Sequence, residues 1–157
     1  MANAAARAFV RYELTISKTH PDPTKLLHVL STPAILVPFA MFEAHYMLNN
    51  GFLRRGQLLD NAHKMIDANL PVKIVHGRCD YVCRPHAAWL LYKALDPDGS
   101  RGTSEVNCEF VSGAGHSDSE PGIIDALVRA TNEFRDRSTD ITDGPGGLNT
   151  WREGQKE

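Results

Sequence analysis

Two short stretches of the chain hold the side chains best suited to chemistry. The first, VHGRCDYVCRPH at residues 75–86, places Asp80 among two cysteines and two histidines, and the second, GAGHS at residues 113–117, places His116 in a glycine-rich turn. A carboxylate that fixes the tautomer of an imidazole makes it a general base, so the pair could be the acid and base of a Ser-His-Asp system. On pattern alone, a turn aspartate and a loop histidine account for these residues equally well.

The first stretch also contains zinc-ligand residue types, namely His76, Cys79, Cys83 and His86. However, C-x3-C without a second cysteine pair is poor spacing for structural zinc. Successive residues of a strand also point to opposite faces, which would separate these side chains further. We therefore expect no metal here and interpret the cysteines as small, partly buried thiols.

Both candidate residues follow predicted strands. The β-branched run at residues 70–78 and the stretch at residues 104–117 each end in a glycine-rich turn, and helices are predicted at residues 85–95 and 123–134. Strand, helix, strand, helix indicates an α/β fold with parallel strands. Because functional groups in such sheets gather outside the carboxyl ends of the strands, Asp80 and His116 should meet there.

The first part of the chain predicts helices instead. Their expected ranges are 4–17, 38–49 and 57–67, with a proline-containing loop at 19–25. Residues 138–157 are polar, have no hydrophobic period and are predicted to form a flexible tail. Two parallel strands cannot make a complete sheet, so we expect the C-terminal part of a larger α/β fold, or a fold that another polypeptide completes.

Composition narrows the classes of partner. The 157 residues carry a net charge of -2 and contain no basic cluster that could neutralise phosphates, so we do not expect nucleic acid as a partner. The longest apolar run, PAILVPFAMF at residues 33–42, is too short to cross a membrane. Three cysteines and the lack of a signal sequence suit a reducing compartment, so we expect a cytoplasmic protein with free thiols.

Two glutamates fall on apolar helical stripes. Glu13 shares a stripe with Phe9 and Ile16, and Glu43 lies on an equivalent stripe of the 38–49 helix. A carboxylate on an apolar face needs a partner because burying an unpaired charge costs several kcal/mol. The alternatives are a cation bound at these carboxylates, or a helix-end glutamate that reaches solvent or pairs with Arg11.

From Ala6 to Phe134 the chain resembles the C-terminal portion of the proline iminopeptidases, α/β-hydrolase serine peptidases that remove N-terminal proline. The stretches that carry the resemblance are ARAFVRYE, HPDP, FEAHYMLNNGFL, QLLDNAHKM, VKIVHGRCDYVCRP and GAGHSDSEPGIIDALVRATNEF. The resemblance implies the C-terminal part of an α/β-hydrolase fold, with a helical cap segment at 1–56, part of the hydrolase core at 57–137 and the tail at 138–157. It also implies that Asp80 orients His116, the general base, and that no metal or organic cofactor is needed.

By the same resemblance, Glu13 and Glu43 would bind the ammonium group of a peptide substrate with a free N-terminal proline. The chain departs from the family at Cys79, where an aromatic residue is usual, and at DPDGSRGTSE (96–105), which we interpret as an inserted surface loop. No G-x-S-x-G nucleophile elbow occurs in the sequence. We therefore expect the nucleophile to belong to the N-terminal half of the hydrolase, and this chain to be inactive alone.

Two alternatives stay open. One is another cap-bearing α/β-hydrolase, such as an epoxide or ester hydrolase, for which paired cap glutamates have no use. The other is a non-catalytic module that forms a homo-oligomer through its exposed sheet edges.

Overall fold

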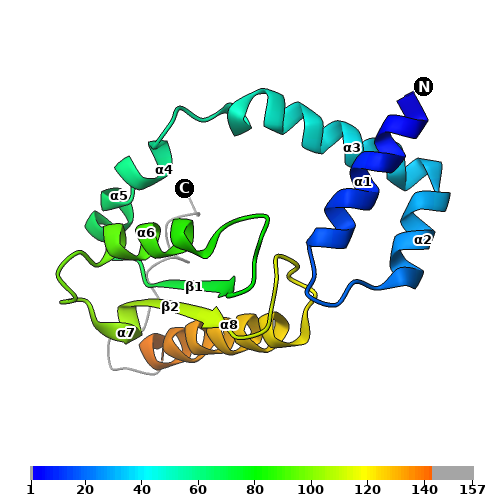
Figure 1. Cartoon of the computed structure of the whole chain (residues 1–157). Coiled ribbons are helices and arrows are strands. Elements are labelled where there is room, and N and C mark those ends of the chain that lie inside the picture. The colour runs from blue at the N-terminus through cyan, green and yellow to red at the C-terminus, as the bar shows by residue number, and fades with distance from the viewer. Residues whose placement is uncertain (1, 143–157) are drawn as a thin grey trace, which may run out of the picture.

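The computed structural model describes residues 2–142 of the chain (Figure 1). In chain order the elements are α1 (Ala2–Ile16), α2 (Pro23–Ser31), α3 (Pro33–Leu48), the 3-10 helix η1 (Asn50–Phe52), α4 (Gln57–Asp60), α5 (His63–Asp67), β1 (Val72–Gly77), α6 (Pro85–Leu95), α7 (Gly102–Glu105), β2 (Val106–Val111) and α8 (Pro121–Thr142).

The two strands form a parallel pair whose ends are level. The register runs from Val72 opposite Val106 to Gly77 opposite Val111. Helix α6 covers one face of the pair and α8 the other (Figure 1), so both faces of the parallel pair are covered. The predicted strand, helix, strand, helix order is confirmed, and this α/β arrangement is consistent with the expected C-terminal part of an α/β-hydrolase fold. Because the strands stop at the same height, the loops that follow them begin side by side.

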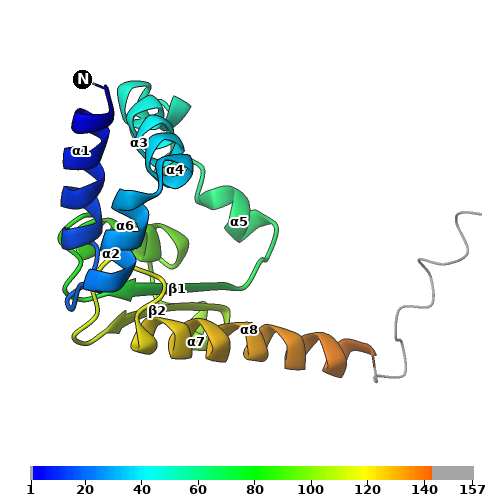
Figure 2. The ribbon, with the colours of Figure 1, turned by 90° about the vertical axis from the view of Figure 1, so that its right-hand side faces the viewer.

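Helices α1, α2 and α3 pack together at the end of the sheet where the strands stop (Figures 1 and 2). Each half of the molecule has its own small buried cluster. The helical half buries Val10, Val29, Leu30, Leu36 and Ala40. The sheet half buries Ala62, Leu95 and Val106, with half-buried neighbours from β1 and α6. The two halves therefore meet mainly through the loops at the strand ends.

The start of α2 corrects the prediction of a loop at residues 19–25. The helix begins at Pro23, and Asp22 is its N-cap: one carboxylate oxygen accepts the N–H groups of Thr24 at 2.9 Å and Lys25 at 3.1 Å. Proline suits the first helical position because that N–H has no partner in a helix anyway. The segment with Pro21 and Pro23 therefore ends one helical stretch and also begins the next helix, at Pro23.

The sequence predicted that this helix begins near Pro38, but α3 begins at Pro33. Thr32 separates it from α2, its hydroxyl donating to the carbonyl of His28 at 2.7 Å. The two helices are bent by 93° at this break. Within residues 2–142 no single helix is long and apolar enough to cross a bilayer, and α2 and α3 satisfy that criterion of length and composition only as a bent pair.

Three other segments differ from the prediction. The single helix expected at 57–67 is two short helices, α4 and α5, and the expected surface loop at 96–105 contains the short helix α7. Helix α8 continues to Thr142, into the segment 138–157 predicted as a tail, and the rest of that segment lies outside the described residues.

Candidate active site

Asp80 lies in the loop that follows β1, and its carboxylate is held on both oxygens. Its Oδ1 accepts the backbone N–H groups of Val82 at 2.9 Å and Cys83 at 2.8 Å. The side chain is only 3% exposed. An aspartate that accepts hydrogen bonds from its own loop has a fixed side-chain direction. The second oxygen, Oδ2, is thereby aimed at the neighbouring loop.

His116 lies in that neighbouring loop, which follows β2. Its Nδ1 is 3.0 Å from Oδ2 of Asp80, and the imidazole is 40% exposed. Because an ionised carboxylate only accepts hydrogen bonds, Nδ1 carries the proton, and in the neutral ring Nε2 keeps its lone pair. The loops therefore bring the predicted acid and base together in the geometry of a general base with an orienting carboxylate.

A second histidine, His76, also faces Asp80. Its Nε2 is 2.8 Å from the carbonyl oxygen of Cys83 and 3.4 Å from Oδ2 of Asp80. A carbonyl can only accept, so this nitrogen carries a proton and fastens the end of the Asp80 loop to β1. The sequence offered His76 only as a metal ligand. The structure instead gives it a role in holding the loop.

Backbone hydrogen bonds hold the two loops together. The N–H of Arg78 donates to the carbonyl of Val111 at 2.9 Å, and the N–H of Cys79 donates to that of Ala114 at 2.8 Å. The strand pairing thus continues one rung beyond the ends of the strands. The distance between Asp80 and His116 is set by main-chain bonds as well as by the side chains themselves.

Gly77 allows this close approach. A Cβ at this buried position would lie 1.9 Å from the carbonyl oxygen of Gly115, the residue before His116. No side chain fits at that distance. The glycine at the end of β1 is therefore required by sterics, since it lets one loop backbone lie directly against the other.

Glu13 on α1 and Glu43 on α3 lie near this pair. Both are half-buried, and Oε2 of Glu43 is buried without a hydrogen-bond partner among the described residues. Burial and the negative charge of Glu13 raise the pKa of Glu43, while the nearby His116 imidazole acts in the opposite direction. The two glutamates and the histidine thus share one electrostatic environment. Glu13 and the buried Oε2 of Glu43 therefore place negative charge close to the His116 imidazole.

Ser117 and Ser119, in the loop between β2 and α8, bond to each other. Their hydroxyl oxygens are 2.8 Å apart, and the N–H of Ser119 lies 3.3 Å from Oγ of Ser117. Among the described residues, no group of three or more His, Cys, Asp or Glu side chains is arranged to hold a metal ion.

Three residues that the sequence did not single out also belong to the site: Ser17, Thr19 and Glu120. The carbonyl of Ser17 accepts the N–H groups of His116 and Ser117 at 2.9 and 2.8 Å. Glu120 accepts the N–H of Gly115 at 2.8 Å and faces the hydroxyl of Thr19 at 2.9 Å. We call these three residues the loop anchor. No sequence signal distinguishes them, because their contacts join segments about a hundred residues apart in the chain.

No family model matches the chain. Among curated proteins, it is 38% identical over 133 residues to a protein from Leptolyngbya boryana named probable proline iminopeptidase, an alignment that covers 84% of this chain and 38% of the relative. It is 39% identical over 132 residues to the proline iminopeptidase of Xylella fastidiosa, covering 83% of this chain and 39% of that protein. The proline iminopeptidase of Arabidopsis thaliana is 33% identical over 133 residues, 84% of this chain and 32% of its own length. The chain thus spans less than two fifths of the relatives it matches.

Proposed function

Because the chain is related to a part of the proline iminopeptidases, we propose that it supplies the acid, the base and the amine-binding groups of a serine peptidase that releases N-terminal proline. The observation that carries the proposal is the 3.0 Å contact between Nδ1 of His116 and Oδ2 of Asp80, with Glu13 and Glu43 close enough to act on each other's charge. The names of the relatives supply the substrate class.

The proposed reaction is acyl transfer. A serine hydroxyl from a segment outside this chain attacks the carbonyl of the substrate's first residue. Nε2 of His116 takes the hydroxyl proton and gives it to the leaving amine, and a water molecule then releases proline from the acyl-enzyme. Asp80 keeps Nδ1 protonated and stabilises the imidazolium while the proton is held. Nothing in these steps uses a metal.

Glu13 and Glu43 would select the substrate. An ammonium group bound between them neutralises two carboxylates that otherwise repel each other, and it pairs the buried Oε2 of Glu43. A peptide with a blocked N-terminus leaves both charges unpaired, so discrimination against it should be strong. An epoxide or ester hydrolase acting on neutral substrates gains nothing from this pair, which favours the peptidase over that alternative.

The remaining segment would dock on the open sheet and on α3. A two-stranded parallel sheet leaves an unpaired backbone edge on each side. Helix α3 is apolar apart from Glu43 and His45, and its C-terminal half exposes Met41, Phe42, Tyr46, Met47 and Leu48. An apolar patch of this kind marks an interaction surface. We propose that residues 1–56 act as the cap and 57–137 as part of the core of the assembled hydrolase.

Complementation tests this proposal. The segment of the Xylella fastidiosa relative that lies outside the alignment is co-expressed with this chain, and release of β-naphthylamine from Pro-β-naphthylamide is measured. We expect no release by the chain alone and release by the complex, with N-acetyl-Pro-β-naphthylamide left intact. A stable complex without activity would refute the peptidase proposal. Activity of the pure chain would refute the need for a second segment.

The exposed sheet edges also favour self-association of the chain, which is the alternative to the peptidase role. Sedimentation of the pure chain tests that role. A discrete homo-oligomer that the complementing segment cannot displace would favour a non-catalytic module.

A further inference from the structure

The loop that carries His116 is bonded directly to the end of α1, the helix that carries Glu13. The N–H of Ser17 donates to the carbonyl of Glu13 at 3.0 Å, and the carbonyl of Ser17 accepts the N–H of His116 at 2.9 Å. A single residue therefore links the backbone of one candidate amine ligand to the backbone of the general base.

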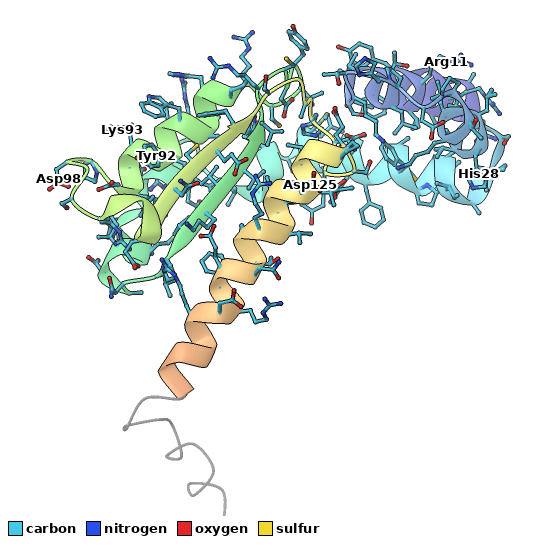
Figure 3. The ribbon with its side chains drawn as sticks, turned by 90° about the horizontal axis from the view of Figure 1, so that it is seen from below. Arg11, His28, Tyr92, Lys93, Asp98 and Asp125 are labelled. Carbon is cyan, nitrogen blue, oxygen red and sulfur yellow. The ribbon has the colours of Figure 1, made fainter. Side chains whose placement is uncertain are left out.

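Glu120 holds this junction from the other side. Its side chain belongs to a residue only 8% exposed, with Oε1 accepting the N–H of Gly115 at 2.8 Å and Oε2 lying 2.9 Å from the hydroxyl of Thr19. A Cβ at Gly115 would lie 2.9 Å from Oε1 of Glu120 and 3.2 Å from the backbone nitrogen of Thr19. The carboxylate is thus wedged between the His116 loop and the α1–α2 connection, with both oxygens in use. Figure 3 shows α8, which follows Glu120, along the lower face of the sheet, and α1 and α2, with Arg11 and His28, beyond its end.

We propose that Glu120 is a positioning residue that fixes the separation between Glu13 and His116. On the proposed function, on which this inference rests, an ammonium group held by the glutamates then presents the carbonyl of the first residue, and no later one, to the imidazole. Glu120 touches neither the substrate nor the reacting groups. It acts through Gly115 on one side and Thr19 on the other.

Two variants of Glu120 separate hydrogen bonding from charge. Glu120→Ala removes both contacts of the Glu120 carboxylate, to Gly115 and to Thr19. Glu120→Gln keeps an oxygen for the N–H of Gly115, and its amide can donate to the oxygen of Thr19, whose own hydroxyl then donates to the carbonyl of Gly113, 2.9 Å away. If Glu120 acts by positioning, glutamine retains the function that alanine loses.

The pKa of Glu43 is a readout that needs no substrate, because it is lowered by the nearby His116. The groups that act on Glu43 are Glu13 on α1, which raises its pKa, and His116 in the β2–α8 loop, which lowers it. Replacing His116 by glutamine should therefore raise the pKa of Glu43 further, as followed by NMR of the 13C-labelled carboxyl groups in the 157-residue chain. The size of that rise reports how close the base remains to the amine site.

We expect the rise to persist in the Glu120→Gln background and to be lost in the Glu120→Ala background. An equal rise in folded Glu120→Ala protein, judged by its circular dichroism, overturns the inference. If Glu120→Ala does not fold, Thr19→Val takes its place; it keeps the bond from Gly115 to Oε1 and removes the hydroxyl's contacts to Oε2, the Gly113 carbonyl and Nδ1 of His20. In that variant a diminished rise supports the inference and an unchanged rise overturns it.

The same spectra separate this inference from the proposed function. Prolinamide, a free amine, is titrated into the wild-type chain, with N-acetylprolinamide as the control. Failure of prolinamide to shift Glu13 and Glu43 refutes the amine site, while the mutant cycle still decides the role of Glu120. In the complemented enzyme, Glu120→Ala should lower kcat about 100-fold with little change in KM, because the amine still binds while the carbonyl is misplaced.

Discussion

Replacing Gly77 with alanine should disrupt the candidate active site from a position that touches no substrate. The added Cβ would lie 1.9 Å from the carbonyl oxygen of Gly115 and 2.6 Å from that of Ala114, whereas real Cβ contacts stay above 3.0 Å. The Gly115 carbonyl must therefore move by more than 1 Å, which is the difference between 1.9 and 3.0 Å. Both obstructing atoms are backbone, so rotation of a side chain cannot relieve the clash.

The displacement has two consequences. Overpacking of this kind, together with loss of the hydrogen bond from Cys79 to Ala114, should lower the free energy of unfolding by about 2–4 kcal/mol. His116 follows Gly115 directly, so a similar shift would lengthen its 3.0 Å hydrogen bond to Asp80 beyond hydrogen-bonding distance. The proton on Nδ1 would then exchange with water.

Urea unfolding followed by circular dichroism measures the first effect, and the downfield proton NMR signal of the His116 Nδ1–H measures the second. Gly122→Ala is the matched control, because the Cβ there would meet only the Cγ1 methyl of Val111, at 2.8 Å, and a side chain can move aside. That variant should change the free energy of unfolding by less than about 1 kcal/mol, since alanine is the better helix former. If Gly77→Ala is as stable as Gly122→Ala and keeps the imidazole signal, the loops do not approach as described.

Three further predictions concern the acid, the amine site and a helix cap. Asp80→Asn should reduce kcat of the complemented enzyme by about 10⁴-fold because the imidazole loses its fixed tautomer, whereas Asp98→Asn in an exposed loop should leave kcat unchanged. Glu43→Gln should stabilise the chain at neutral pH. Burial and the charge of Glu13 raise the pKa of Glu43 in the folded chain above its usual 4.5, so the wild-type protein loses stability as the pH rises above 4.5 and glutamine does not. This gain should vanish in urea titrations below the usual glutamate pKa, and a gain that persists there would contradict the assignment. Asp22→Ala should cost about 1 kcal/mol in the same unfolding assay by removing the N-cap of α2, with no effect on the His116 signal.

The sheet half of the molecule was largely predictable from the sequence. The β-branched runs identified both strands, and the helix from Pro85 to Leu95 has the predicted ends. Strand order then placed Asp80 and His116 at the same edge, because the carboxyl ends of neighbouring parallel strands share one edge whatever the loops contain. That prediction needs only the fold class and the residues that follow each strand.

The helical half was less predictable because proline can either begin a helix or break one. Pro23 and Pro33 each occupy the first position of a helix, yet the same residue type also breaks helices, so the prediction omitted α2 and shortened α3. The Asp-Pro pair at residues 22–23 was the available signal, an N-cap followed by a first-turn proline. The role of Glu120 had no such signal, since its partners become neighbours only in the folded chain.

The parallel pairing of β1 and β2 also decides where the molecule can be modified. The connection at residues 96–105 leads from α6 into the start of β2, whereas His116 follows the end of that strand. The six residues of β2, roughly 20 Å, therefore separate this connection from the loops that hold Asp80 and His116. Gly99 in this connection has a positive φ and open space around it. A fluorophore attached at Ser100, or an affinity tag inserted beside it, would therefore report on assembly with the proposed complementing segment from a point remote from Asp80 and His116.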